Sequence, residues 1–366
     1  MKQNLRSLQN ISQKVQTQQR LSFEDGLRLF QNTDILTLGK MAQSVRERLH
    51  GRRVFYSVNL HLNHTNICST QCDFCAFSRD AGASDAYALT LDEVEHTVRE
   101  AVDRWHINEV HIVGGHHPDL GFDYYLEMIQ RIRGIGPAIY IKAFSATEIH
   151  DIAKRAGLSV EEVLRQLKSK GLDGLPGGGA EIFDPEVRRK LCPQKISGEE
   201  WIAVHRTAHR LGLQTNATML YGHLESDAQR VEHLLKLREL QDETHGFFSF
   251  VPLAYHPGKN AIKDIHEASG FLDLKILSIS RLLLDNIPHI KVHWAATDLK
   301  FAQVALSFGA DDMGGTHLDE RVMHEAGSRS PRDLSADDLV RLIKDAGFES
   351  CLVNSSYQIQ EIKGVY

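Results

Sequence analysis

The chain lacks any apolar stretch that approaches the roughly 20 residues needed to cross a bilayer. Its start, Met1-Lys-Gln-Asn-Leu-Arg6, lacks the apolar core of a secretion signal. Cysteine is scarce, with five in 366 residues, which argues against a disulfide scaffold. A formal net charge of −6 leaves no basic footprint for nucleic acid. We therefore expect a protein of the reducing cytoplasm with neither a membrane nor a nucleic-acid partner.

The chain has what a large packed domain needs, since 42% of its residues are hydrophobic and 25% are charged. Residues 1–50 show helical patterns and are expected to form an N-terminal helical segment. After residue 50 the pattern changes to alternating strands and helices. Strands are expected at 54–60, 109–113, 138–144, 171–175, 214–220, 247–253, 290–295 and 310–313.

Alternation of this kind predicts a parallel sheet in an α/β protein, and eight strand–helix units favour a closed (β/α)8 TIM-type barrel. We expect the barrel to span residues 51–315. Residues 316–366, with one more helix at about 333–347, are expected to form a C-terminal helical extension packed on the barrel. In such barrels the functional groups lie just after the strands, at the carboxyl-terminal rim.

One loop after the first expected strand carries three cysteines, Cys68, Cys72 and Cys75, in the segment Asn66-Ile-Cys-Ser-Thr-Gln-Cys-Asp-Phe-Cys-Ala-Phe77. Three thiolates at C-x3-C-x2-C spacing can hold three irons of a [4Fe–4S] cluster and leave the fourth iron open. Clusters that only transfer electrons use four cysteines, so three indicate that a substrate or cofactor binds the open iron. A zinc site with His64 as fourth ligand is the alternative, although no second Cys or His pair follows.

Several sequence segments at the expected strand ends resemble those of the menaquinone and deazaflavin branch of the radical S-adenosylmethionine (radical SAM) enzymes. They are His111-Ile-Val-Gly-Gly-His-His-Pro118, Leu175-Pro-Gly-Gly-Gly-Ala-Glu181, His205-Arg-Thr-Ala-His209 and Thr215-Asn-Ala-Thr-Met-Leu-Tyr-Gly-His223. Within that branch the aminofutalosine synthase family is the most similar, on Leu191-Cys-Pro-Gln-Lys195, Pro252-Leu-Ala-Tyr-His-Pro257 and Gly314-Gly-Thr316. One departure is His116, where the branch more commonly carries an apolar residue.

The resemblance implies a transferase of menaquinone biosynthesis by the futalosine pathway. Its [4Fe–4S] cluster would bind SAM at the open iron, and the 5′-deoxyadenosyl radical would add to 3-[(1-carboxyvinyl)oxy]benzoate. The products would be 6-amino-6-deoxyfutalosine, methionine and bicarbonate. A reductant such as flavodoxin or ferredoxin is implied as a partner, and a homodimer is compatible with the family.

The site residues follow from these motifs. Cys68, Cys72 and Cys75 are expected to bind the cluster, and Phe74, Gly114, Gly115, Glu148 and Gly178 to bind SAM. The substrate carries two carboxylates, so cationic or donor side chains near the rim are expected to bind it. The candidates are Arg79, His116, His117, Arg206, His223 and His256, with Lys142 as a further cation. Cys192 and Cys351 are expected to be buried thiols that lie away from the cluster.

Three alternatives stay open at this point. The first two, cyclic dehypoxanthinyl futalosine synthase and the relative that forms the deazaflavin chromophore from tyrosine, belong to the same branch. The third is a binding module that holds an iron–sulfur cluster or zinc without catalysis. Product analysis separates the enzymes, and iron and sulfide counting separates them from the module.

Overall fold

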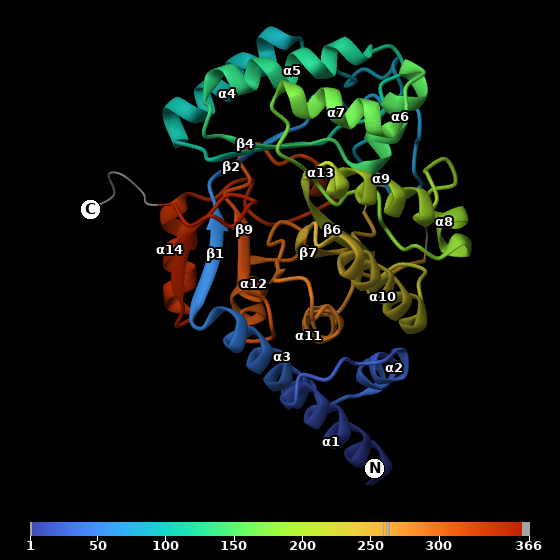
Figure 1. Ribbon diagram of the computed structural model, residues 1–366, viewed down its shortest axis with the longest axis vertical. Coiled ribbons are helices and arrows are strands. Elements are labelled where there is room, and N and C mark those ends of the chain that lie inside the picture. The colour runs from blue at the N-terminus through green and yellow to red at the C-terminus, as the bar shows by residue number, and fades with distance from the viewer. Residues whose placement is uncertain (1, 259, 261, 263, 361–366) are drawn as a thin grey trace.

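The structure of the chain is a computed structural model that describes residues 2–258, 260, 262 and 264–360. It begins with three helices, α1 (Lys2–Gln16), α2 (Phe23–Gln31) and α3 (Ile35–His50), which lie at one end of the molecule (Figure 1). Helices α2 and α3 pack against α10 and α11 of the body. Residues 2–50 are therefore helical as expected.

The body is built on a seven-stranded parallel sheet in the order β2-β3-β4-β5-β6-β7-β8. Its strands are β2 (Asn59–Leu62), β3 (Glu109–Ile112), β4 (Tyr140–Ala143), β5 (Gly174–Leu175), β6 (Gln214–Tyr221), β7 (Phe247–Ala254) and β8 (His289–Ile290). Neighbours in the sheet are also neighbours in the chain, which is the strand order of a (β/α)8 barrel. The TIM-type α/β class predicted from the sequence is confirmed.

The barrel is closed by the segment around β9 (Asp312–Gly315) rather than by an eighth long strand. Single parallel bridges join Lys291 to Asp312 on one side of this segment and Leu60 to Leu318 on the other. Strand β9 also belongs to a second sheet of order β10-β1-β9, with β1 (Arg53–Ser57) and β10 (Glu349–Leu352). The C-terminal region thus shares a sheet with the start of the body, while the division at residues 50 and 315 stays a prediction.

The single strand expected at 54–60 is wrong, because the chain divides there into β1 and β2. The N–H of Val58, between the two strands, donates to Asn108 Oδ1 at 3.1 Å instead of joining a ladder. Strand β1 then leaves the barrel to pair with β9 and β10. These partners lie more than 250 residues away in sequence, where no local pattern could predict them.

The remaining helices are α4 (Leu91–Trp105), α5 (Phe122–Ile135), α6 (Ala146–Ala156), α7 (Val160–Lys170), α8 (Pro185–Leu191), α9 (Gly198–Arg210), α10 (Asp227–Thr244), α11 (Gly270–Leu283), α12 (Leu299–Ala305), α13 (Val322–Ala326) and α14 (Ala336–Asp345). Most of them cover the outside of the barrel (Figure 1), whereas Val322 and Met323 of α13 line the interior cavity. Helices α6, α8 and α13 were not expected. Ser145 and Glu148 form a capping box that starts α6, a signal that the sequence did contain.

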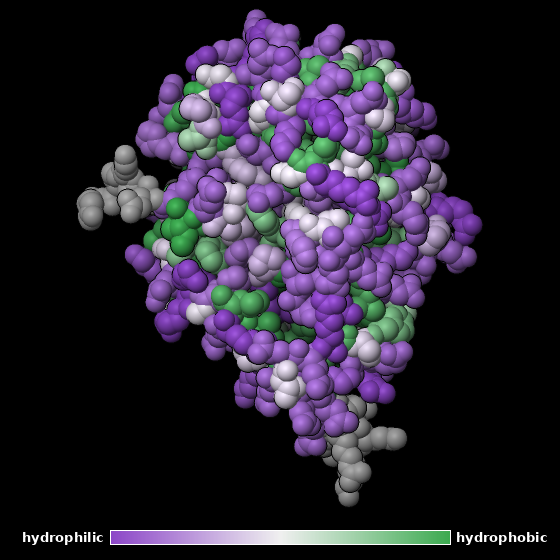
Figure 2. All heavy atoms as spheres, viewed as in Figure 1, coloured by the Kyte–Doolittle hydropathy of each residue, from purple (hydrophilic) through white to green (hydrophobic). Residues whose placement is uncertain are grey.

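The visible face of the molecule is mostly hydrophilic, with small and separated apolar areas (Figure 2). In the part of the chain that the structure describes, no helix is both long enough and apolar enough to span a membrane.

A buried ion pair lies at the opposite end of the barrel from the cysteine loop. The Arg281 guanidinium contacts the Asp311 carboxylate, which also accepts hydrogen bonds from His289 Nδ1 at 2.6 Å and from the Ile290 N–H at 2.8 Å. Burial alone raises the pKa of Asp311, but Arg281 and His289 outweigh it and hold the pKa well below its usual range. The carboxylate is therefore charged and fully paired.

Replacing Asp311 with alanine is expected to lower the free energy of unfolding by about 3–5 kcal/mol, because Arg281 would stay buried without its counterion. The control is Asp242→Ala, which removes a partly exposed partner of Arg20 and is expected to cost less than about 1 kcal/mol. Thermal and denaturant unfolding measure both. The folded-state pKa of Asp311 is depressed, so its contribution is present above pH ~4 and is lost as the pH falls. Equal losses in the two variants would contradict this account.

Candidate active site

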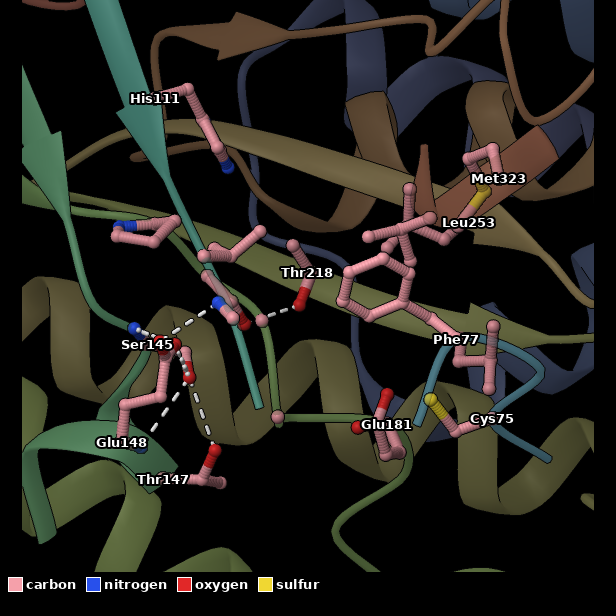
Figure 3. Close-up of a pocket in the computed structure, with 18 of the residues that line it drawn as sticks. Cys75, Phe77, His111, Ser145, Thr147, Glu148, Glu181, Thr218, Leu253 and Met323 are labelled. Carbon is pink, nitrogen blue, oxygen red and sulfur yellow. Dashed lines mark hydrogen bonds between the residues drawn. The ribbon is translucent and has the colours of Figure 1, made fainter. Parts of the chain in front are cut away.

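A cavity of about 290 Å³ occupies the barrel interior and reaches the carboxyl ends of the strands. The three cysteines line it at one side, together with the turn at Gly114 and Gly115 that follows β3. Figure 3 shows Cys75 near Phe77 and Glu181, with Ser145, Thr147 and Glu148 grouped elsewhere on the wall. The cysteines and the predicted SAM-binding residues therefore share one cavity.

The cysteine loop is held by backbone hydrogen bonds to segments beside it. The Cys68 N–H donates to Arg79 O at 3.1 Å, and the Ser69 N–H donates to His116 O at 3.0 Å. Within the loop, the Cys75 N–H donates to Cys72 O at 2.9 Å. All three thiols are free and line the cavity. The loop thus presents three sulfur atoms from a fixed backbone.

The arrangement of the thiols does not fit a single zinc ion. Three thiolates on one tetrahedral zinc, at Zn–S of about 2.3 Å, would lie roughly 4 Å from one another. Among the described residues, only His50, His289 and Asp311 bring three such ligand atoms within 4.8 Å of one another, and Arg281 already neutralises that group. The three cysteine sulfurs are therefore not all within 4.8 Å of one another, as one zinc ion would need.

His64, the alternative zinc ligand, does not face the thiols. Its ring is buried among Tyr124, Tyr125 and Phe144, with centroids 5.8–6.2 Å away. Burial and nearby His117 lower its pKa to about 3, so the ring is neutral. His64 is therefore a packing residue beneath Gly114.

The Gly114-Gly115 turn needs glycine because of what lies against it. A Cβ on Gly114 would come within 2.4 Å of the His64 ring, and one on Gly115 would come within 2.2 Å of Ile67 O. Both residues line the cavity as expected. Their lack of side chains lets β3 approach the cysteine loop, a structural reason that the SAM-binding interpretation did not include.

Glu148 lies in the cavity wall, where it links two segments. Its carboxylate accepts hydrogen bonds from the Gly114 N–H at 3.0 Å and from the Ser145 N–H at 2.7 Å. Burial raises the pKa of Glu148 to about 7, although these hydrogen bonds act to lower it. The residue therefore stabilises the start of α6 and the glycine turn, and its predicted contact with SAM stays a prediction.

A buried ion pair lies beside the cysteine loop. Lys195 Nζ lies 2.5 Å from Glu181 Oε1 and 5.0 Å from the centre of the Phe74 ring. Burial raises the pKa of the Cys72 thiol to about 12, while nearby Lys195 acts to lower it. The lysine thus places positive charge beside the sulfur atoms, where a thiolate-bound cluster would carry negative charge.

Of the six predicted substrate residues, only His116 lines the cavity. Its Nδ1 lies 2.9 Å from Thr70 Oγ1 and its Nε2 3.2 Å from Thr147 Oγ1, so both ring nitrogens have partners. Burial lowers its pKa to about 4. The departure from the family pattern at this position therefore adds a neutral, hydrogen-bonded wall residue.

The other five lie outside this cavity. Arg79 bonds Asp85 at 2.7 Å and lines an open hollow on the outer side of the cysteine loop. Arg206 is on α9, where it pairs with Glu243 at 2.8 Å. His117, His223 and His256 bond, respectively, the Asp119 N–H, Leu220 O and Ala296 O. Their placement argues against direct substrate contact, because each has a local partner.

Cys192 corrects another expectation. It packs in a small apolar cluster with Cys72, Leu220 and Tyr255, so it is buried as predicted but next to the cysteine loop. The turn after α8, which the sequence did not predict, brings it there. Cys351 lies on β10, outside the lining of the cavity.

Sequence reasoning missed most of the polar residues inside the barrel. They are Asn59, His61, His111, Lys195, Asn216, Lys291, His293 and His317, all of which line the cavity. A signal was present, because Asn59 and His61 alternate with Leu60 and Leu62 along one strand. Period-two alternation in a buried barrel strand places the polar set in the interior.

Comparison with known proteins identifies the family. Residues 62–237 match the radical SAM superfamily, and residues 244–365 match the CofH/MqnC C-terminal region. The chain is 46% identical over 341 residues to an aminodeoxyfutalosine synthase of Thermus thermophilus, covering 92% of this chain and 91% of that protein. The chain belongs to the aminodeoxyfutalosine synthase family of radical SAM enzymes.

A related branch is nearly as similar. A 5-amino-6-(D-ribitylamino)uracil–L-tyrosine 4-hydroxyphenyl transferase of Methanopyrus kandleri is 40% identical, over 84% of this chain and 85% of that protein. Among solved structures, methylornithine synthase superposes with a TM-score of 0.76 at 18% identity, covering 94% of this chain and 98% of that one. That likeness shows the fold alone.

The family's [4Fe–4S] cluster and SAM fit the residues present. Three free thiols on one loop leave one iron of a cube without a protein ligand, as SAM binding requires. Gly178 lines the cavity, and a Cβ there would meet only Ser145 Cβ at an ordinary 3.5 Å. Protein packing therefore does not demand glycine at this position, and its predicted contact with SAM stays a prediction.

Gly115→Ala is expected to reduce cluster loading to a small fraction of the wild-type value. The new Cβ would collide with Ile67 O, a backbone atom, so the cysteine loop must move. Gly121→Ala is the matched control, because no atom lies within 4 Å of a Cβ at that turn. Iron and sulfide per chain after anaerobic reconstitution measure the effect. Full loading in Gly115→Ala would show that the close contact is unimportant.

Proposed function

We propose that this enzyme adds the 5′-deoxyadenosyl group of SAM to the enolpyruvyl double bond of 3-[(1-carboxyvinyl)oxy]benzoate. The products are aminodeoxyfutalosine, methionine and bicarbonate. The observation that carries the proposal is the cavity, lined at one side by the cysteines and elsewhere by buried donor groups. Two small molecules can therefore lie in one space, and the 46% identity to an aminodeoxyfutalosine synthase selects the reaction.

The protein's part in this reaction is to hold two ligands and exclude water. When bound, the cluster supplies the electron that cleaves SAM to methionine and the 5′-deoxyadenosyl radical. Phe74, Gly114, Gly115, Glu148 and Gly178 line the cavity near the cysteines and are proposed to contact SAM. Phe77, Leu253 and Met323 lie together on the apolar wall (Figure 3). This wall supports the proposal because it would shield a reactive carbon from water.

We also propose that a small electron carrier such as flavodoxin or ferredoxin reduces the cluster in the cytoplasm. Free, cavity-lining thiols support a reducing environment, since oxidation would remove the ligands. The open hollow beside Cys72, Cys75 and Arg79 is the nearest surface for such a donor. A homodimer remains part of this proposal, and light scattering of the purified enzyme tests it.

The 4-hydroxyphenyl transferase reaction is a second candidate, favoured by the 40% identity to the Methanopyrus kandleri protein. The two candidates differ in the fate of SAM. Addition leaves the adenosyl group in the product, whereas a radical that abstracts hydrogen leaves as 5′-deoxyadenosine.

The deciding experiment uses SAM labelled in adenine, reductant and the enolpyruvyl benzoate under anaerobic conditions. We expect the label in a species heavier than 5′-deoxyadenosine, detected by mass spectrometry. Parallel incubations with tyrosine plus 5-amino-6-(D-ribitylamino)uracil, and with the dehypoxanthinyl substrate, test the rival reactions. The proposal would be overturned if the enolpyruvyl benzoate gave no adduct and either alternative substrate gave stoichiometric 5′-deoxyadenosine.

Alanine in place of Cys68, Cys72 or Cys75 is expected to abolish SAM cleavage, because each removes one thiolate from the cluster. Cys351→Ala is the control and is expected to retain full cleavage, since it lies on β10 outside the lining of the cavity. Methionine release on reduction, together with iron content, measures the effect. Normal turnover with full iron loading in any one of the three variants would show that its cysteine is not a ligand.

A further inference from the structure

Four histidines line the part of the cavity that lies inside the barrel. They are His61 on β2, His111 on β3, His293 after β8 and His317 after β9, named here the histidine cluster. The rings of His61 and His111 stack with centroids 4.7 Å apart, and His317 lies 4.7 Å from His61 and 4.6 Å from His293. The adjacent segments β8, β9, β2 and β3 thus bring four imidazoles together.

His317 is held in a strained and well-defined position. Its backbone has φ of 51°, an uncommon value for a residue with a side chain. Its N–H donates to Asn59 Oδ1 at 2.9 Å, and its ring stacks on Trp294 at 4.7 Å. Such fixed placement of a polar ring suits a binding role.

The hydrogen bonds of His317 leave one ring nitrogen without a partner. The Gly315 N–H donates to His317 Nε2 at 3.2 Å, so Nε2 is unprotonated and the neutral ring carries its proton on Nδ1. Burial and nearby His293 hold the pKa of His317 well below its usual range, which keeps the ring neutral. Among the described residues nothing accepts a hydrogen bond from this buried Nδ1–H. A buried donor without an acceptor is costly, and a bound ligand would satisfy it.

His293 shows the same deficit. Its Nδ1 is buried without a partner, and across the described residues no hydrogen bond joins its ring to another group. The ring nitrogens of His61 and His111 likewise have no hydrogen bond to any described residue, although both rings line the cavity. Four imidazoles therefore offer polar nitrogens to whatever occupies this space.

The charged side chains around the histidine cluster favour a ligand that accepts hydrogen bonds. Lys142 pairs with Glu109 at 2.8 Å, and Lys291 pairs with Asp312 at 3.2 Å. Both lysines line the cavity, while neither of the two acidic partners does. Glu148, Glu181 and Glu320 also line the cavity, but Glu181 pairs with Lys195 and Glu320 with His324. The two lysines and the imidazole nitrogens around the histidine cluster therefore match a carboxylate ligand.

We propose that the histidine cluster binds the benzoate carboxylate of the aryl substrate, an inference that rests on the proposed function. The enolpyruvyl carboxylate and the vinyl CH2 share one carbon, so that end must lie toward the cysteines. The ring carboxylate is the far end of the molecule and reaches the barrel interior. Figure 3 shows His111 and Cys75 on opposite sides of the view, with Phe77 and Thr218 between them, where the aryl ring would lie.

The test measures ligand binding to the reconstituted holoenzyme with SAM and without reductant, so that no turnover occurs. Equilibrium dialysis gives the Kd of the enolpyruvyl benzoate, of 3-(vinyloxy)benzoate and of 2-phenoxyacrylate, which lacks the ring carboxylate. In His293→Leu we expect a Kd roughly 10- to 100-fold higher for the two benzoates. For 2-phenoxyacrylate we expect a change below about twofold, because it has no group for the cluster to bind.

His205→Leu is the matched control. His205 is also buried with an unpartnered ring nitrogen, but it lies on α9 outside the lining of the cavity. All three Kd values are expected to stay unchanged there. If His293→Leu does not fold, His111→Leu replaces it, because its ring likewise has no hydrogen bond to a described residue. An unchanged Kd for the benzoates, or an equal loss for all three ligands, would overturn the inference.

The outcomes also separate this inference from the proposed function. Wild-type enzyme that binds the benzoates, with the expected losses in His293→Leu, supports the carboxylate site even if SAM yields only 5′-deoxyadenosine. Wild-type enzyme that binds neither benzoate overturns both. A variant that keeps its affinity for the benzoates while the wild type forms the adduct overturns the histidine cluster alone.

Discussion

The active site depends on the close approach of the turn after β3 to the cysteine loop. Gly115 leaves room for Ile67 O, and Gly114 leaves room for the His64 ring. The Gly114 N–H then reaches the Glu148 carboxylate at 3.0 Å, which connects the turn to the start of α6. The absence of side chains at these two glycines therefore lets the segments after three consecutive strands pack against one another. Backbone hydrogen bonds and close backbone packing thus set the positions of the three sulfur atoms.

The barrel interior obeys a different constraint. Parallel strands in a closed barrel point every second residue inward, and here the inward rows carry charge and imidazole. The pairing of His61 with His111 and of His111 with Lys142 places three polar side chains in one layer. Charges in such a place persist only with partners, which Lys142 finds in Glu109 and Lys291 in Asp312. The imidazoles are neutral and incompletely bonded, so they are the groups that remain available to a ligand.

Local patterns predicted most of the fold. The helices and the inner strands β3, β4, β6 and β7 follow from hydrophobic period and capping residues within a few turns of chain. The break at Val58 and the pairing of β1 with β10 could not be predicted, because their cause is a contact between distant segments. Helix α6 was missed although its capping box was visible, because Glu148 was interpreted as a SAM-binding residue. A residue can both start a helix and line a site.

The same reasoning explains why the cysteine loop could be predicted locally, whereas of the predicted substrate-binding cations and histidines only His116 and Lys142 line the cavity. Three cysteines within eight residues need only local spacing to define a cluster site. Whether a cation is free to bind a substrate carboxylate depends instead on whether it already has an acidic partner. Arg206 pairs with Glu243 of another helix, which its local sequence does not reveal. At an exposed rim such a charge is also weakened by water, whereas a donor inside the barrel acts through a lower dielectric. The fewer but unpaired imidazoles of the interior therefore offer a carboxylate more than the numerous paired charges outside it.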